Sequence, residues 1–239
     1  MKKYQFRPSW AASSGLVLIL PLFIALGFWQ LHRAEEKGLL MAQRQHGLVE
    51  PMLAADSDAW ASEENRYRRV ELAGEFDSAH QFLLDNQIVN QQAGYAVLTP
   101  LRIQGRESAV LVNRGWLAVG KDRMQLPVIG VKQAQVRFVG MIDKLPGVGF
   151  RLKGAEIPSP GWPAVVQVAD AERLSERLGY RVLPYQVLLP HDEGDAYAID
   201  WKPVSLHPET NQGYALQWFS FALLALVLYV WYGFKPKLP

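Results

Sequence analysis

Two long apolar segments without a charged residue lie near the two ends of this chain, at residues 9–31 and 214–234. Each is about as long as the ~20 apolar residues that a helix needs to cross a bilayer. No run of comparable length occurs in the polar sequence between them. The pattern predicts two transmembrane helices that flank one domain at residues 32–213, with short tails at 1–8 and 235–239.

The first apolar segment has the basic start of a signal peptide but differs from one in length and ending. It is longer than the roughly 7–15 apolar residues of a signal-peptide core, and no small-x-small cleavage motif ends it. It ends instead in Gly27-Phe-Trp-Gln-Leu-His-Arg33. We therefore expect a retained membrane anchor.

The orientation of the two spans follows from the basic residues in the tails. These are Lys2, Lys3, Arg7, Lys235 and Lys237. Basic residues close to the ends of a span favour the cytoplasmic side of the membrane. The sequence therefore predicts that both termini are cytoplasmic and that the main domain lies outside the cytoplasm.

Composition and motifs disfavour several classes of function. The net charge is only +2 and no Lys/Arg-rich run is present, so we expect no nucleic-acid partner. The chain has no cysteine, which excludes disulfides, thiolate metal sites and a cysteine nucleophile. The five histidines form no close metal-ligand cluster, and no nucleophile, phosphate-loop or dinucleotide motif occurs. We therefore expect neither a metal site nor an enzyme.

Between the spans, the apolar pattern takes the period of two that is typical of half-buried strands. Strand-like runs cover 68–76, 81–84, 95–103, 109–119, 135–142, 164–168 and 185–189. The apolar residues of 109–119 run continuously, as expected for a strand buried on both faces. Asp170 and Gly179 are suited to cap one short amphipathic helix between them, while residues 34–48 continue the first span as a helix. The predicted fold class is an α+β membrane protein in which two transmembrane helices flank an antiparallel β-barrel-like extracytoplasmic domain with one helix.

Polar residues gather where each span meets water. Gln30, His32 and Arg33 end the first span, and Asn211, Gln212 and Gln217 lie around the start of the second. If the spans pack antiparallel, these groups lie at one depth. They either form helix–helix hydrogen bonds or contact a partner or cofactor.

Ordered motifs along nearly the whole chain resemble the surfeit locus protein one family of cytochrome c oxidase assembly proteins. The matching segments are 27–33 with Glu36-Lys37, 67–70 with 74–76, 99–101, 112–116, 162–167 with Asp170, and 208–209 with 214–219. The most specific is Val112-Asn-Arg-Gly-Trp116. The resemblance implies a two-pass protein of the bacterial inner membrane with a periplasmic β-rich domain. It also implies a non-enzymatic assembly factor for a haem-copper oxidase that handles haem a transiently.

The resemblance also indicates where contacts form. We expect haem a near His207, Asn211, Trp29, Gln30 and Trp218. We expect partner contacts at Arg33, Asn113, Arg114, Trp116, Tyr214 and Gln217. The partners implied are the oxidase catalytic subunit, the enzymes of haem a synthesis and the lipid bilayer.

Two features of these motifs leave alternatives. Family members usually carry a histidine where this chain has Asn211, and an amide is a poor ligand for haem iron compared with an imidazole. His207 or His32 are the possible substitutes. In the central motif, Gly115 indicates a bulge with Trp116 packed over it, and Arg114 forms either a buried structural pair or a partner contact.

Two other classes of function compete with assembly. A permanent accessory subunit of an oxidase would have the same anchors without handling haem. A membrane-anchored hydrolase would need catalytic motifs that the sequence lacks.

The predicted topology is testable with reporter fusions. Alkaline phosphatase fused near Gly147 is expected to be active, because the enzyme needs the oxidising periplasm, and a fluorescent protein fused after Pro239 is expected to fluoresce in the cytoplasm. The reverse pattern would overturn the orientation.

Overall fold

The structure is a computed structural model that describes residues 4–56, 58–120, 122–123, 125–147, 154–197 and 207–236. Lys2, Lys3 and Lys237, which entered the prediction of orientation, lie outside the described residues. The chain divides into two units. One comprises residues 1–42 and 203–239, and the other comprises residues 43–202.

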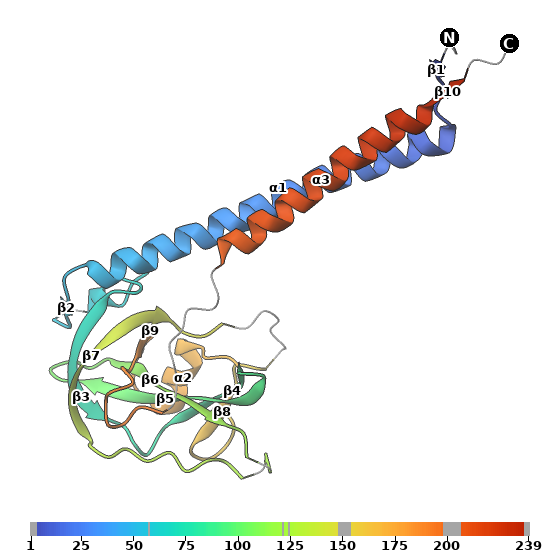
Figure 1. Cartoon of the computed structure of the whole chain (residues 1–239). Coiled ribbons are helices and arrows are strands. Elements are labelled where there is room, and N and C mark those ends of the chain that lie inside the picture. Colours follow the sequence, from blue (N-terminus) through green and yellow to red (C-terminus); the bar gives the residue numbers. More distant parts are fainter. Residues whose placement is uncertain are drawn as a thin grey trace. The chain divides into compact units, whose positions relative to one another are not determined.

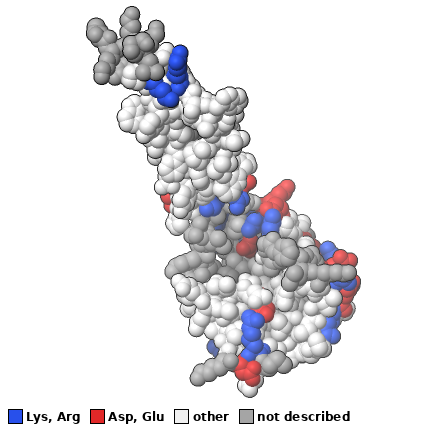
Figure 2. All heavy atoms as spheres, turned by 90° about the vertical axis from the view of Figure 1, so that its right-hand side faces the viewer, with Lys and Arg blue, Asp and Glu red and all other residues white. Residues whose placement is uncertain are grey.

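The first unit is built on two long helices, α1 (Trp10–Val49) and α3 (Pro208–Gly233). Both are long and apolar enough to cross a membrane. In the most apolar 18-residue stretch of each helix, only 6% (α1) and 11% (α3) is buried within the protein. A core helix of a soluble protein would be mostly buried, so these helices indicate a membrane protein. One face of the pair shows almost no charge over most of its length (Figure 2).

Both helices extend beyond their apolar segments. Helix α1 continues to Val49, which confirms the predicted helical continuation through residues 34–48. Helix α3 begins at Pro208, earlier than the predicted start of the span. Proline is favoured in the first turn of a helix because its missing N–H has no partner there anyway.

The two helices run antiparallel (Figure 1), and small residues lie between them. Ala34, Ala215 and Ala222 are buried, and a Cβ added at Gly27 would lie 2.5 Å from the ring of Phe219. Small residues let helix backbones approach closely in lipid, where the hydrophobic effect no longer drives association. Gly27 therefore marks a close helix contact.

A short pairing joins the outer ends of these helices. Strand β1 (Tyr4–Phe6) pairs antiparallel with β10 (Phe234–Pro236). The ring of Phe6 packs edge-on against Tyr229 and Phe234. No sequence pattern predicts this pairing, which places Tyr4–Phe6 and Phe234–Pro236 side by side (Figure 1).

The second unit is a barrel-like sheet with one helix (Figure 1). Its strands are β2 (Leu53–Ala54), β3 (Arg69–Phe76), β4 (Phe82–Val89), β5 (Gln92–Ile103), β6 (Ala109–Ala118), β7 (Gln135–Lys144), β8 (Ala164–Val166) and β9 (Val182–Leu188), with a 3-10 turn, η1, at Asp58–Trp60. Strands β3, β7, β9, β6 and β5 pair in that order, and β5 returns to β3. The ring is closed, which confirms the barrel-like fold class.

The sheet is mixed rather than wholly antiparallel. The pairs β2–β3, β4–β8 and β6–β9 are parallel, and the other pairings are antiparallel. Period-two alternation predicts that a segment is a strand and which face is buried, but it carries no information on the direction of its neighbour. The predicted antiparallel, barrel-like domain is confirmed in its architecture, but these three pairs are parallel.

Strand β6 separates two parts of the core. Val110 and Val112 belong to the cluster enclosed by the ring, whereas Leu111 packs with Phe82 and Leu174 in a second cluster. This confirms that the continuous apolar run is a strand buried on both faces. The second cluster is covered by α2 (Ala171–Leu178), whose N-cap Asp170 accepts a hydrogen bond from the Arg173 N–H at 3.2 Å.

Candidate functional site

The central motif on β6 places a guanidinium inside the domain. The Arg114 side chain is 2% exposed, and its five N–H donors have five recorded acceptors. Nε donates to the Asp195 carbonyl at 2.9 Å. Nη1 donates to Gln81 Oε1 at 3.0 Å and Thr99 Oγ1 at 3.4 Å. Nη2 donates to the Gly130 carbonyl at 2.6 Å and to Asp195 Oδ1 at 3.4 Å.

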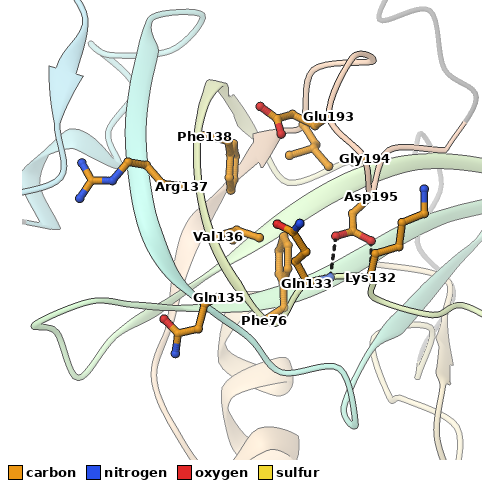
Figure 3. A pocket seen from close by; sticks show the side chains of 11 residues that line it. Phe76, Lys132, Gln133, Gln135, Val136, Arg137, Phe138, Glu193, Gly194 and Asp195 are labelled. Atoms are coloured by element: carbon orange, nitrogen blue, oxygen red, sulfur yellow. Dashed lines mark hydrogen bonds between the residues drawn. The ribbon is translucent and has the colours of Figure 1, made fainter.

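This junction ties two loops to the barrel. Asp195 also accepts the backbone N–H of Lys132 at 2.7 Å and of Gln133 at 3.4 Å, so its carboxylate is shared between the loops (Figure 3). The ring of Tyr197 lies 4.9 Å from the Arg114 guanidinium carbon. Burial lowers the pKa of Arg114, but a guanidinium stays protonated even so.

A cleft of about 300 Å³ lies on the outer side of the junction, between the loop that carries Asp195 and strands β3 and β7 (Figure 3). The stacked rings of Phe76 and Phe138 line it, with Lys132 and Arg137 among the other residues. The Asp195 carboxylate is already bonded to the protein, and Arg137 pairs with Glu71 at 3.3 Å. The cleft is therefore the exterior of a structural junction, and its charged groups do not converge on a shared point.

The flanking residues of the motif are also bonded internally. Asn113 is buried and donates to Gln186 Oε1 at 2.9 Å, and its own oxygen accepts the Gly115 N–H. Gly115 has φ of 121°, which agrees with the predicted irregularity in the strand. The Trp116 indole donates to the Gln87 carbonyl at 2.8 Å. The structural alternative for Asn113 and Arg114 is the one that these contacts support.

At the helix pair, three polar side chains form a clamp between α1 and α3. Asn211 Nδ2 donates to Gln30 Oε1 at 2.6 Å, and Lys37 Nζ donates to Asn211 Oδ1 at 2.7 Å. Gln30 and Lys37 lie seven residues apart, which places them on one face of α1. The prediction that Gln30 and Asn211 lie at the same depth of the helix pair is confirmed by their hydrogen bond. The sequence analysis assigned no role to Lys37.

The other residues expected near Asn211 are spread over the helix pair. Trp218 packs on Phe23 and Phe221, about two turns farther along α3. The Trp29 side chain is half exposed, as is that of Tyr214, and Gln217 is exposed.

The charged residues near the clamp are engaged within their own helices. Arg33 pairs with Glu36 at 2.7 Å, and His32 lies 3.4 Å from the same carboxylate. His207 bonds Glu209 at 2.7 Å.

These contacts test whether residue 211 suits a haem iron. Its carbonyl oxygen already accepts an ammonium donor, and its amide nitrogen is a donor without a lone pair for a metal. His207 lies one turn away, with its Nδ1 2.7 Å from Glu209 Oε1. Asn211 itself does not fit an iron ligand.

The fold thus defines a class: a membrane protein whose two candidate spans precede and follow a barrel-like β-domain in the sequence. A family model described as the SURF1 family matches residues 17–223, which covers the whole β-domain and part of each apolar helix. The chain belongs to the SURF1 family.

Curated relatives agree with this assignment. The chain is 24% identical over 236 residues to a SURF1-like protein of Rickettsia prowazekii, which covers 93% of this chain and 91% of that protein. It is 25% identical over 143 residues to the Surfeit locus protein 1 of Xenopus tropicalis, covering 53% of this chain and 47% of that protein. A SURF1-like protein of Drosophila melanogaster is 25% identical over 145 residues, covering 54% and 48%.

Sequence reasoning missed Asp195 and Lys37. No local pattern distinguishes Asp195 from the acidic turn around it, because its role depends on a strand far away in the sequence. Lys37 could have been found from its spacing of seven residues from Gln30, which is the helical repeat of a packed face.

We expect Arg114→Lys to destabilise the domain, because an ammonium has three donors and cannot satisfy the fork of acceptors around the guanidinium. The loss is expected to be several kcal/mol, as for a broken buried charge pair (~3–5 kcal/mol). Chemical unfolding of the purified chain measures it. Arg137→Lys, on an exposed arginine paired with Glu71, is the matched control. A stable Arg114→Lys protein that loses function would favour a partner contact instead.

Asn211→Leu is expected to weaken the helix pair, because it leaves Lys37 and Gln30 without their shared partner. We expect a loss of about 0.6–2 kcal/mol, the range found for helix–helix hydrogen bonds in membranes. Unfolding in detergent, with a double-mutant cycle that includes Lys37→Met, isolates the pair. Gln212→Leu changes the exposed neighbour and serves as control. Additive effects of Asn211→Leu and Lys37→Met would contradict the clamp.

Proposed function

We propose that this protein is an assembly factor for a haem-copper terminal oxidase, acting on the maturation of the catalytic subunit without being an enzyme. The observation that carries the proposal is the family match, which extends from one apolar helix through the β-domain into the other. The motif resemblance to oxidase assembly proteins supplies the biochemical role.

The geometry supports a docking role more than a catalytic one. The buried polar groups of the central motif are used inside the domain. Among residues that the structure describes, no group of three or more His, Cys, Asp or Glu is placed to hold a metal ion. The apolar helices have almost no buried surface within the chain, which leaves them free for lipid and for helices of a membrane-bound partner.

We place the protein in the bacterial inner membrane, with both termini in the cytoplasm and the β-domain in the periplasm. The β1–β10 pairing supports a shared side for the two termini. The basic tails support the cytoplasm as that side. A periplasmic domain held by two spans would act near the outer surface of the membrane.

Haem a belongs to this proposal as a transient cargo, delivered from the enzymes of its synthesis to the catalytic subunit. Haem supplies the redox-active iron of the mature oxidase. In this chain the clamp at Asn211 does not supply an iron ligand, so an iron ligand would have to come from another residue.

A permanent accessory subunit remains the second candidate, because the helix pair would serve equally well as a fixed interface. Stoichiometric recovery of this chain with the mature, active oxidase would favour it. Recovery only with incompletely assembled oxidase would favour the assembly factor.

Deletion of the gene is expected to lower haem-copper oxidase activity several-fold while the oxidase polypeptides are still synthesised. Activity, the reduced cytochrome spectrum and immunoblots of the subunits are the measurements, and re-expression of the wild-type chain is the control. Any second family member in the same cell has to be deleted as well. Unchanged spectra and activity would remove the assembly role.

A further inference from the structure

One face of helix α3 carries a regular stripe of exposed side chains. Its members recur every three or four residues, and they are Gly213, Gln217, Ser220, Leu224, Val227 and Trp231. All six are exposed within the protein, with Leu224 and Val227 at 53% and Trp231 at 67%. Alternating steps of four and three residues are the spacing of heptad positions a and d along the seam between paired helices. We call these six residues the α3 seam.

The α3 seam lies on the side of α3 that faces away from α1. Ala215 and Ala222 are buried at the contact with α1, and at about 100° of rotation per residue they lie roughly opposite Gln217. Among the described residues, no atom lies within 4 Å of a Cβ added at Gly213, whereas a Cβ added at Gly27 of α1 would meet the ring of Phe219. The contact between the two helices therefore leaves the seam uncovered.

Two polar side chains of the seam lie inside the apolar segment 214–234. The Ser220 hydroxyl donates to the Leu216 carbonyl of its own helix at 2.8 Å. The Gln217 amide has no hydrogen-bond partner among the residues that the structure describes, whereas the amides of Gln30 and Asn211 are bonded to each other. An amide without a partner is unfavourable in hydrocarbon, and the usual partner in a membrane is another helix. Gln217 therefore points to a helix from outside this chain.

The residues on either side of Gln217 permit a close approach of that helix. Gly213 lies one turn before Gln217 and Ser220 one turn after it, and both are small. Small residues let helix backbones come close together in lipid, where packing and hydrogen bonds replace the hydrophobic effect. Farther along the seam, Leu224 and Val227 offer apolar side chains for packing. The seam thus combines a close contact, an unpaired amide and an apolar stretch on one face.

A second copy of this chain meets these requirements by symmetry. Two copies inserted with the same topology have parallel α3 helices, so that identical residues lie at the same depth. An amide has both donors and an acceptor, so two Gln217 side chains that face each other across a twofold axis can each donate to the other. A single polar residue in an apolar seam also fixes the register of such a pair. An unrelated helix would need a complementary group at that same depth.

We propose that two copies of this protein associate in the membrane along the α3 seam, with reciprocal Gln217 hydrogen bonds that set the register. The dimer uses a face of α3 that the Gln30–Asn211–Lys37 clamp does not use, so the helix pair of each copy stays intact. The assembly therefore contains four membrane helices and holds both β-domains on the same side of the membrane.

The first test locates the contact by disulfide cross-linking. The chain has no cysteine, so a single introduced cysteine reports contacts between copies without background. Leu224→Cys and Val227→Cys in the full-length chain are oxidised in native membranes with copper phenanthroline, and non-reducing gels measure the linked dimer. We expect dimers from both variants, because a disulfide forms only where two Cα atoms come within about 7 Å. Leu226→Cys, exposed on the opposite side of α3, is the matched control and is expected to give none.

The second test measures the strength of the association in lipid vesicles. Förster transfer between donor and acceptor fluorescent proteins fused after Pro239 gives the dissociation constant of the full-length chain. Gln217→Leu is expected to raise it by roughly 3- to 20-fold, the range for losing a helix–helix hydrogen bond in a membrane. Ser220→Ile is expected to raise it at least about tenfold, because the added bulk blocks the close approach. Gln212→Leu, the same change on an exposed residue outside the seam, is expected to behave like the wild type.

Several results would overturn the inference. A wild-type chain that stays monomeric in vesicles would show that Gln217 is satisfied at the membrane surface. Equal cross-linking at Leu226 and Leu224, or a dimer that neither Gln217→Leu nor Ser220→Ile weakens, would place the contact elsewhere. Cross-links from the seam to another protein, without a linked dimer, would assign the seam to that partner. The measurements do not involve the oxidase, so their failure and a negative deletion experiment are distinguishable.

Discussion

The β-domain depends on one buried cation. A guanidinium that is 2% exposed is tolerated only because five acceptors surround it, and those acceptors come from strands and loops far apart in the sequence. Removing any of them would leave a desolvated donor. The Arg114 junction therefore fixes the positions of the loops around residues 130 and 195 relative to the barrel, and through Gln81 it also positions the turn that carries His80.

The two helices associate through other interactions than those that hold the β-domain together. Lipid offers apolar surface as favourable as another helix, so two spans associate through close packing and a few polar bonds. Here Gly27 and three buried alanines supply the close packing, and the Gln30–Asn211–Lys37 clamp supplies the polar bonds. The clamp uses the same residue that the family resemblance assigns to an iron ligand. In this chain Asn211 instead forms hydrogen bonds between α3 and α1.

Both networks, the Arg114 junction and the Gln30–Asn211–Lys37 clamp, stabilise the fold. The polar side chains of the most specific motif, Asn113 to Trp116, form hydrogen bonds within the domain and stabilise its fold. The side chains of Asp77, His80 and Trp162, by contrast, contact one another near the surface of the domain.

The sequence by itself determined the two apolar helices, the strands, the continuation of α1 and the caps of α2, because these depend on local composition and period. It also indicated that residues 109–119 are buried on both faces. The tertiary structure alone decided the strand directions, the β1–β10 pairing, the acceptors of Arg114 and the contacts of His80 with Asp77 and Trp162. Each of these joins segments separated by tens of residues, and a local pattern carries no information about which distant segment becomes its neighbour. That is why Asn113 and Arg114 were interpretable in two ways from sequence, and why their contacts, once seen, favoured one.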